Sequence, residues 1–240
     1  MRVVAFNSSP RDQQTSKTEL VLQKFLDGAA RAGAVAETIY LRNYRVRNCL
    51  GCFACWLKTP GRCIQQDDMT GELFDRLLEA DLVVLATPLY YYNMNARLKT
   101  FIERTLPMSQ PFFEKQGDRT DHPSRFGKVP QVVALSVCGF PEQDNFKALS
   151  LNMRMIFGSR LVAEIYRHSS EFLPIEHPQI VPQAAKVLAA VAQAGEEVVT
   201  EGKVSSATLE ALTQDLAPRE VIINLANEHF KQELARLTQE

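Results

Sequence analysis

Four of the chain's five cysteines lie within one short stretch, in the order Cys49-x2-Cys52-x2-Cys55-x7-Cys63. In a reducing compartment such crowding indicates metal, cluster or redox chemistry rather than a disulfide framework. Three thiolates spaced by two residues can face one centre and a fourth can return from a loop, which suits a [4Fe-4S] cluster. Zinc is a second interpretation, although zinc sites more often use two well-separated Cys-x2-Cys pairs. The third is a reduced loop without metal, which serves the structure or a subunit contact.

The hydroxyl-rich loop within residues 6–18 is a second stretch whose residues could bind a ligand. It joins a β-branched run at 2–7, which predicts a strand, to apolar residues at helical spacing in 17–32. A helix start offers free N–H groups and the positive end of the dipole, so it can bind an anion. Arg11 adds a forked donor that suits phosphate. The loop lacks the glycines of G-x-G-x-x-G and of a P-loop. Side-chain hydroxyls would therefore bind the anion together with the backbone N–H groups. An ordinary turn with a serine cap is the alternative.

The elements that would position these two stretches alternate along the chain. Apolar runs predict five strands, at residues 2–7, 35–41, 82–87, 129–137 and 161–166. Helical spacing predicts helices at 17–32, after the Asp67–Thr70 cap, after Asn95 and around 146–156. The uninterrupted run at 82–87 is typical of a strand covered on both faces. This order predicts a parallel sheet between two helix layers, with right-handed crossovers.

Two segments fall outside this alternation. Residues 107–128 contain prolines and glycines that break any periodicity, so we expect a long loop, serving as a lid or a dimer contact. Residues 169–240 should form helices near 180–201, 205–214 and 218–236, packed on the preceding 1–168 domain or at a dimer contact. For the last helix, packing against the sheet is preferred over a dimer seam. Its apolar stripe consists of Ile222, Leu225, Ala226, Phe230 and Leu234.

Composition excludes several classes of function. The chain has 240 residues, 45% of them hydrophobic, and a net charge of −1. No basic stripe with interleaved aromatics is present, so nucleic acid is not an expected partner. No apolar run reaches the length of a membrane span, and the first residues enter a strand directly, so we expect a cytoplasmic protein without a signal peptide. The four histidines are scattered and no nucleophile elbow occurs, which argues against hydrolysis.

Several motifs in the right order together carry a family resemblance. They are Ser8-Ser9-Pro10-Arg11, the Ser16–Thr18 pair, the cysteine run, Asp67-Asp68-Met69 and Thr87-Pro88-Leu89-Tyr90. The chain thereby resembles the NADPH-dependent FMN reductase and multimeric flavodoxin superfamily, and within it most closely the iron–sulfur flavoproteins. The resemblance covers residues 1 to about 168. It implies a flavodoxin-like three-layer α/β sandwich, whose five-stranded parallel sheet has the order 2-1-3-4-5, with added C-terminal helices.

The resemblance also implies where FMN would bind. The phosphate loop falls on Ser8, Ser9, Arg11, Ser16 and Thr18. The isoalloxazine loop falls on Pro88, Leu89, Tyr90, Tyr91, Tyr92, Asn93 and Met94, and the third ligand loop on Val137, Cys138, Gly139 and Phe140. Cys138 fits a small core residue better than a redox partner. The flavin carries the hydride and electron chemistry in this family, so no side chain is expected to be catalytic.

The function implied is that of an FMN-dependent NAD(P)H oxidoreductase that passes electrons to a quinone, a flavin or a similar small acceptor. The alternative is an electron carrier in which FMN and a [4Fe-4S] cluster at Cys49, Cys52, Cys55 and Cys63 relay electrons between protein partners, such as a ferredoxin-like one. A sensing module is a third option. A homodimer or homotetramer is expected, because flavin sites in this family usually lie at subunit contacts.

Overall fold

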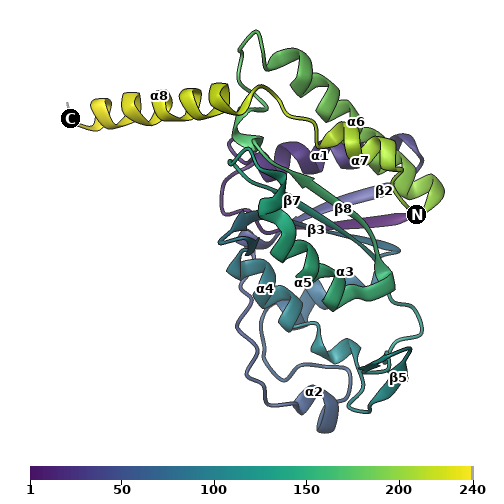
Figure 1. Cartoon of the computed structure of the whole chain (residues 1–240). Coiled ribbons are helices and arrows are strands. Elements are labelled where there is room, and N and C mark those ends of the chain that lie inside the picture. The colour runs from purple at the N-terminus through teal and green to yellow at the C-terminus, as the bar shows by residue number, and fades with distance from the viewer. Residues whose placement is uncertain (239–240) are drawn as a thin grey trace.

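The computed structural model describes residues 1–238, and its centre is a parallel sheet with the strand order β2-β1-β3-β7-β8 (Figure 1). This order and the parallel pairing confirm the flavodoxin-like arrangement expected from the sequence. The strands are β1 (Arg2–Asn7), β2 (Val35–Tyr40), β3 (Leu82–Tyr90), β7 (Gln131–Val137) and β8 (Leu161–Arg167). β1 and β3 are buried along nearly their whole length, which explains their continuous apolar runs.

Helices cover both faces of the sheet (Figure 1). One face carries α1 (Lys17–Arg31) and α6 (Val181–Glu201), and α7 (Ser206–Leu212) joins the same apolar cluster. The other face carries α3 (Phe74–Glu79), α4 (Ala96–Glu103) and α5 (Lys147–Phe157). The short α2 (Ala54–Leu57) lies within the cysteine loop, away from both layers. The sheet therefore has two cores, one on each face.

Two glycines let α1 and α6 approach each other at backbone distance. A Cβ added to Gly28 would lie 1.7 Å from the carbonyl oxygen of Ala192, and one added to Gly195 would lie 1.9 Å from that of Phe25. Any side chain at either position would force the helices apart. This close contact makes α6 part of the layer that covers β1 and β3, although it follows residue 168. Packing on the same domain is one of the two arrangements expected for residues 169–240. The expected domain boundary after residue 168 stays a prediction.

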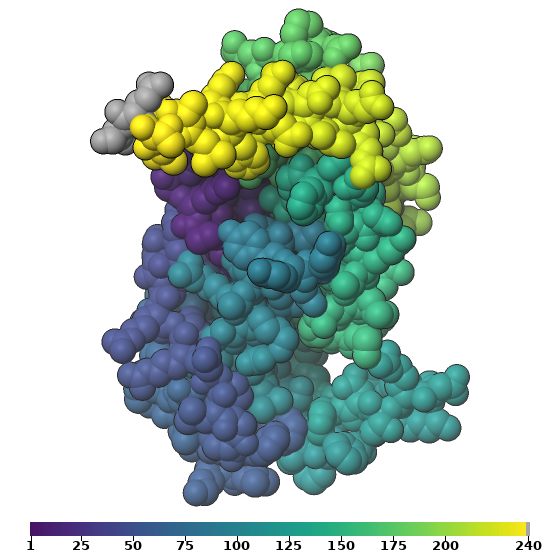
Figure 2. Space-filling view, turned by 60° about the vertical axis from the view of Figure 1, so that its left-hand side comes forward, coloured from purple at the N-terminus to yellow at the C-terminus, as the bar shows by residue number. Residues whose placement is uncertain are grey.

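The last helix, α8 (Arg219–Leu237), only begins on the body and then extends away from it (Figures 1 and 2). Ile222 is buried and Leu225 and Ala226 pack against the same cluster as α1. Phe230 and Leu234 are each 64% exposed. The preferred interpretation, packing against the sheet, therefore holds for the first turns of the helix and is wrong for the rest of its stripe.

Three other details differ from the sequence-based expectations. β3 continues to Tyr90 and pairs with β4 (Asn93–Met94), so part of the expected loop at 88–95 is a tight hairpin. Residues 107–128 contain the hairpin β5 (Glu114–Gln116) and β6 (Arg119–Asp121) rather than only irregular chain. The helix after Asp67 starts with one π-helical turn, Met69–Leu73, whose N-cap residue Asp68 makes no side-chain cap, although the Oδ1 of Asp67 accepts a hydrogen bond from the N–H of Thr70 (3.4 Å). Within residues 1–238, no helix is long and apolar enough to cross a membrane.

Candidate functional site

The loops that follow β1, β3 and β7 lie together at the carboxyl edge of the sheet, because these three strands are neighbours. In an open parallel sheet, ligands bind outside the carboxyl ends of the strands. The fold thus brings together the three loops in which the sequence placed a site. The edge is open, and its exposed aromatic side chains are Tyr90, Tyr91, Tyr92 and Phe140.

The first loop is built around the start of α1. Ser16 caps the helix, since its Oγ accepts a hydrogen bond from the N–H of Glu19 (3.1 Å) and donates one to the Oγ of Ser9 (2.9 Å). Ser8 turns the other way and donates its hydroxyl to the carbonyl of Ala86 (3.0 Å). Ser9 and Ser16 therefore border the helix start, whereas the Ser8 side chain fixes the loop to β3. Thr18 is buried in the first turn.

Two cations of this loop converge on one carboxylate. Arg11 pairs with Glu171 (2.8 Å), and the Nζ of Lys17 lies 3.8 Å from the other carboxylate oxygen. Within residues 1–238, the N–H groups of Lys17 and Thr18 find no acceptor. Glu171 thus stands where the helix dipole and two side chains would hold an anion. Sequence reasoning missed Glu171, because it comes from the loop after β8, far away along the chain.

The second loop is tied to the first by Asn95. Its Nδ2 donates to the carbonyl of Ser8 (2.7 Å), while its Oδ1 caps α4 by accepting from Leu98 (3.1 Å). Its N–H donates to the hydroxyl of Thr87 (3.1 Å). Asn95 was not among the predicted site residues, although its position just before a helical pattern is a signal for a cap. It keeps the two loops in register, so it positions the site without needing to touch a ligand.

The tip of the β3–β4 hairpin is strained. Tyr91 and Tyr92 both have a positive φ, 46° and 62°, in a two-residue turn that normally takes Asn-Gly. Tyr91 is 100% exposed, so packing within this chain does not explain the tyrosines. Strained residues of this kind cluster at active sites and ligand-binding loops.

We predict that replacing both tyrosines by Asn-Gly (Tyr91→Asn with Tyr92→Gly) stabilises the fold. Each left-handed non-glycine residue costs about 1–2 kcal/mol, so the melting temperature should rise by several degrees. The exchange Tyr91→Phe with Tyr92→Phe keeps the strain and serves as the matched control. A lower melting temperature for the Asn-Gly variant in a thermal scan would show that the rings contribute more than the turn costs.

Two predicted ligand residues are turned into the interior. Met94 belongs to the core between the sheet and α4, so its backbone alone can reach a ligand. Cys138 is buried, and burial raises the pKa of its thiol to about 11. This thiol is protonated at neutral pH, which agrees with a core role. Gly139 lies at the exposed rim beside Glu171, where an added Cβ would meet the Glu171 side chain at 3.5 Å.

The cysteine loop lies apart from the sheet (Figure 1). All four of its cysteines are free thiols, and only Cys55 is buried. Burial raises the pKa of the Cys55 thiol, and the neighbouring Cys63 adds to that effect. Among residues 1–238, no group of three or more metal-binding side chains is arranged to hold a metal ion. The donor chemistry suits a cluster, but the geometry does not fit one without movement of the loop, so we derive no step through it.

A buried ion pair holds both ends of that loop. Arg104, the C-cap residue of α4, makes two hydrogen bonds to Asp67 (2.6 and 3.0 Å), and both side chains are 1% exposed. Arg104 also donates to the carbonyl of Arg47 (2.8 Å), and Asp67 accepts from the Arg47 N–H (2.9 Å). The pair therefore joins residues 47 and 67 to α4. Sequence reasoning took Asp67 for a helix cap, and nothing in the local pattern marks Arg104 as its partner.

The fold defines a flavodoxin-like α/β protein, and its three loops meet at the edge of the sheet where open parallel sheets bind their ligands. The chain belongs to the NADPH-dependent FMN reductase family, whose model matches residues 1–136, more than half of its length. An iron-sulfur flavoprotein of Archaeoglobus fulgidus is 37% identical over 111 residues, which are 45% of this chain and 46% of that protein. The chain thus spans about half the length of the curated relatives it matches.

Solved structures agree with the fold. An NAD(P)H:quinone oxidoreductase from Methanothermobacter marburgensis aligns with a TM-score of 0.58 at 19% identity, covering 82% of this chain and 96% of that one. An FMN-dependent NADH-azoreductase from Bacillus anthracis, solved in complex with FMN, aligns with a TM-score of 0.57 at 16% identity, covering 83% and 99%. At these identities the likeness shows the fold alone.

Proposed function

We propose that this chain binds FMN non-covalently at the carboxyl edge and is an NAD(P)H oxidoreductase that reduces a quinone, a flavin or a similar small acceptor. One observation carries the proposal: Arg11, Lys17 and the start of α1 converge where the family's phosphate loop falls, with the Glu171 carboxylate standing in for an anion. The donors suit a phosphate monoester, because they combine a forked guanidinium, an ammonium and backbone N–H groups.

The chain's own residues would bind and orient the cofactor. Arg11 and Lys17 would exchange Glu171 for the phosphate, and Ser9 and Ser16 would add hydroxyls. Asn95 would keep the ring-binding loop in register with the phosphate loop. When bound, FMN supplies the capacity to accept a hydride and pass on electrons. No acid or base of the chain is required, and the protonated Cys138 takes no part.

We further propose that a second copy of the chain completes the site, as a homodimer or homotetramer. The open aromatic edge supports this proposal, since within residues 1–238 Tyr91 is fully exposed and Phe140 is largely exposed. Size-exclusion chromatography with light scattering tests it. A monomer that holds FMN tightly would contradict it.

The cysteine loop supports a second candidate function, an electron carrier between protein partners. The four thiols have the compact spacing of a [4Fe-4S] site, and curated relatives of the matched region are called iron-sulfur flavoproteins. In this function Cys49, Cys52, Cys55 and Cys63 would hold the cluster after the loop closes. Iron and acid-labile sulfide in anaerobically purified protein would support this candidate, and their absence would leave the reductase.

Electron donors separate the two candidates. For the reductase we expect rapid oxidation of NADH or NADPH by the FMN-loaded protein when a quinone is present. For the carrier we expect slow turnover with both nucleotides and reduction by a ferredoxin-like donor. Slow turnover with every donor and acceptor would contradict both and favour a sensing module. A cytoplasmic location remains part of this proposal.

A further inference from the structure

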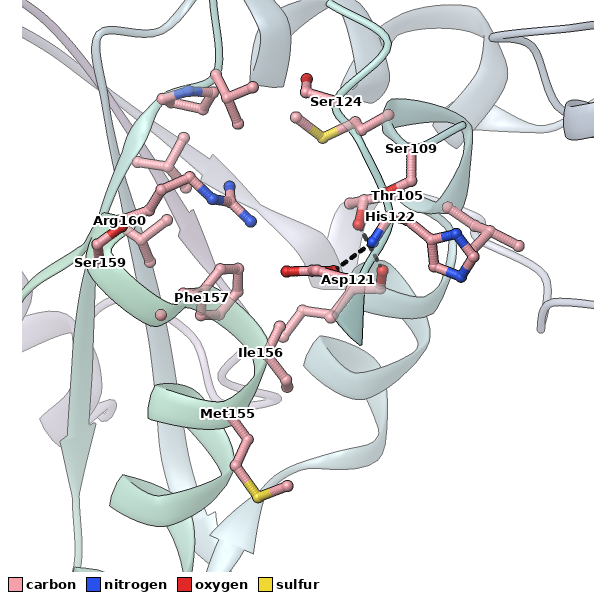
Figure 3. A pocket seen from close by; sticks show the side chains of 18 of the residues that line it. Thr105, Ser109, Asp121, His122, Ser124, Met155, Ile156, Phe157, Ser159 and Arg160 are labelled. Carbon is pink, nitrogen blue, oxygen red and sulfur yellow. Dashed lines mark hydrogen bonds between the residues drawn. The ribbon is translucent and has the colours of Figure 1, made fainter. Parts of the chain in front are cut away.

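A cavity of about 600 Å³ lies at the amino edge of the sheet, opposite the proposed flavin site (Figure 3). Its floor is the start of β3 and β7, its walls are the carboxyl ends of α4 and α5, and the β5–β6 hairpin borders its mouth. The volume is within the range of pockets that hold small molecules. The family resemblance assigns no role to this place.

The deep part of the cavity is apolar. Val83 and Leu85 of β3 and Phe101 of α4 line it, and Ile156 and Phe157 of α5 extend the lining toward the mouth. An apolar lining of this depth suits an aromatic or branched aliphatic group of a ligand.

One guanidinium points into this apolar space (Figure 3). The side chain of Arg160 is half-buried, and within residues 1–238 it has no hydrogen bond and no ion pair within 4 Å. The ring of Phe157 lies 5.5 Å from its guanidinium carbon, and the carboxylate of Asp121 is near enough to act on its charge. Burial lowers the pKa of Arg160, and the nearby charge of Asp121 offsets this effect only in part. An arginine in such a place is a donor without an acceptor.

The charged side chains around the cavity have a net charge that favours one monovalent anion. Among the lining side chains, Glu103 pairs with Lys99 and Arg154 pairs with Glu164. The remaining charged side chains that line it are Arg119, Asp121 and Arg160. Two cations and one carboxylate give an excess of a single positive charge. Asp121 faces the cavity from the hairpin, so it disfavours a dianion such as a phosphate monoester (Figure 3).

We propose that this cavity binds a small apolar monocarboxylate, whose carboxylate is held by Arg160 and whose apolar part lies against β3, α4 and α5. The planar fork of a guanidinium matches a carboxylate in a bidentate manner. The ligand would thereby satisfy the donor that the chain leaves unpaired. The proposal does not depend on the flavin site, because the two sites lie at opposite edges of the sheet.

Isothermal titration of FMN-loaded protein with 2-naphthoate, and with its uncharged methyl ester, tests the proposal. We expect saturable binding of 2-naphthoate, weakened at least about tenfold by Arg160→Gln, because a charge-assisted pair is lost. The ester should bind both proteins weakly and equally. The exchange Arg31→Gln, on the opposite face of the sheet, is the matched control and should change nothing.

Thermal unfolding without ligand separates binding from a structural role. Arg160→Gln should leave the melting temperature unchanged or raise it, because the half-buried charge makes no hydrogen bond or ion pair that the exchange would break. Absence of saturable binding to the unaltered protein would overturn the proposal. Equal affinity of the Arg160→Gln variant for 2-naphthoate would also overturn it. So would a lower melting temperature of this variant together with equal losses of affinity for the acid and the ester, because Arg160 would then have a structural role.

Discussion

Replacing Asp67 by asparagine should lower the free energy of unfolding by about 3–5 kcal/mol, the usual cost of removing one partner of a buried ion pair. Asp67 and Arg104 are fully enclosed, and the exchange would leave the guanidinium buried without its counter-charge. The chain packing around Arg104 gives it no other carboxylate within hydrogen-bond distance among residues 1–238. Urea unfolding measures the loss, and Asp75→Asn, an exposed carboxylate on the next helix, is the matched control.

The double exchange Asp67→Asn with Arg104→Met distinguishes the pair from its neighbourhood. The double variant buries no charge, and removing both charges of a buried pair costs less than leaving one of them unpaired, so it should regain part of the stability. If the double variant loses as much stability as the two single variants together, the two side chains do not act as a pair.

The Asp67–Arg104 ion pair should also control access to the cysteine loop. Both of its anchor points, residues 47 and 67, depend on Arg104. In the Asp67→Asn variant a thiol-reactive dye should therefore label Cys55, the buried thiol, faster than in the unaltered protein. An unchanged labelling rate would show that the loop is held elsewhere.

The pH dependence of this contribution follows from the lowered pKa of Asp67. Burial alone would raise that pKa, but the hydrogen bonds from Arg104 and from the Arg47 N–H outweigh it. A carboxyl whose pKa is depressed in the folded state stabilises fully above its unfolded pKa and loses this contribution as the pH falls through the folded one. The difference between the unaltered protein and Asp67→Asn should therefore shrink only in acid, below the ordinary aspartate pKa of 3.8.

Exchanging Ser9→Ala together with Arg11→Ala should weaken FMN binding at least tenfold. Hydrogen bonds to a charged group contribute about 1.5–3 kcal/mol each, and part of the arginine's contribution is offset because it must first leave Glu171. Fluorescence titration of FMN measures the affinity. The exchange is expected to leave folding intact, because Arg11 is exposed and Ser9 bonds only within the loop.

Glu171→Gln should act in the opposite direction. It removes the carboxylate that competes with phosphate for Arg11 and Lys17, and exposed pairs of this kind are worth about 0.2–1 kcal/mol. FMN should therefore bind up to about fivefold more tightly. Unchanged affinity in both variants would remove the loop after β1 from the site, whereas a change only in the double alanine variant would mean that Glu171 moves aside without cost.

The centre of the sheet could be predicted from the sequence because its middle strands β1, β3 and β7 are buried on both faces and so appear as unbroken apolar runs. Val3–Phe6 and Leu82–Ala86 are of this kind, and both lie where the pattern places them. The close contact of α1 and α6 was not predictable, since it depends on two glycines far apart in the chain. The β5–β6 hairpin was not predicted, because its strands are short and exposed and show no apolar alternation.

The meeting of the three expected ligand loops was predictable, because the strands that precede them follow one another in the sheet. The loops after β1, β3 and β7 come together because the strands that precede them pair. What the sequence could not show is which side chains turn inward, such as Met94 and Cys138, and which partners arrive from elsewhere. Glu171 and Arg104 are of this second kind, because a long-range ion pair leaves no local pattern in a sequence.

The most direct test of the central proposal is the visible spectrum of the protein after mixing with FMN and removing the unbound flavin. We predict flavin bands that correspond to about one FMN per chain, because one site is proposed, at the carboxyl edge of the sheet. A protein that emerges without flavin after saturation with FMN would contradict the account, because the carboxyl edge would then not be a flavin site.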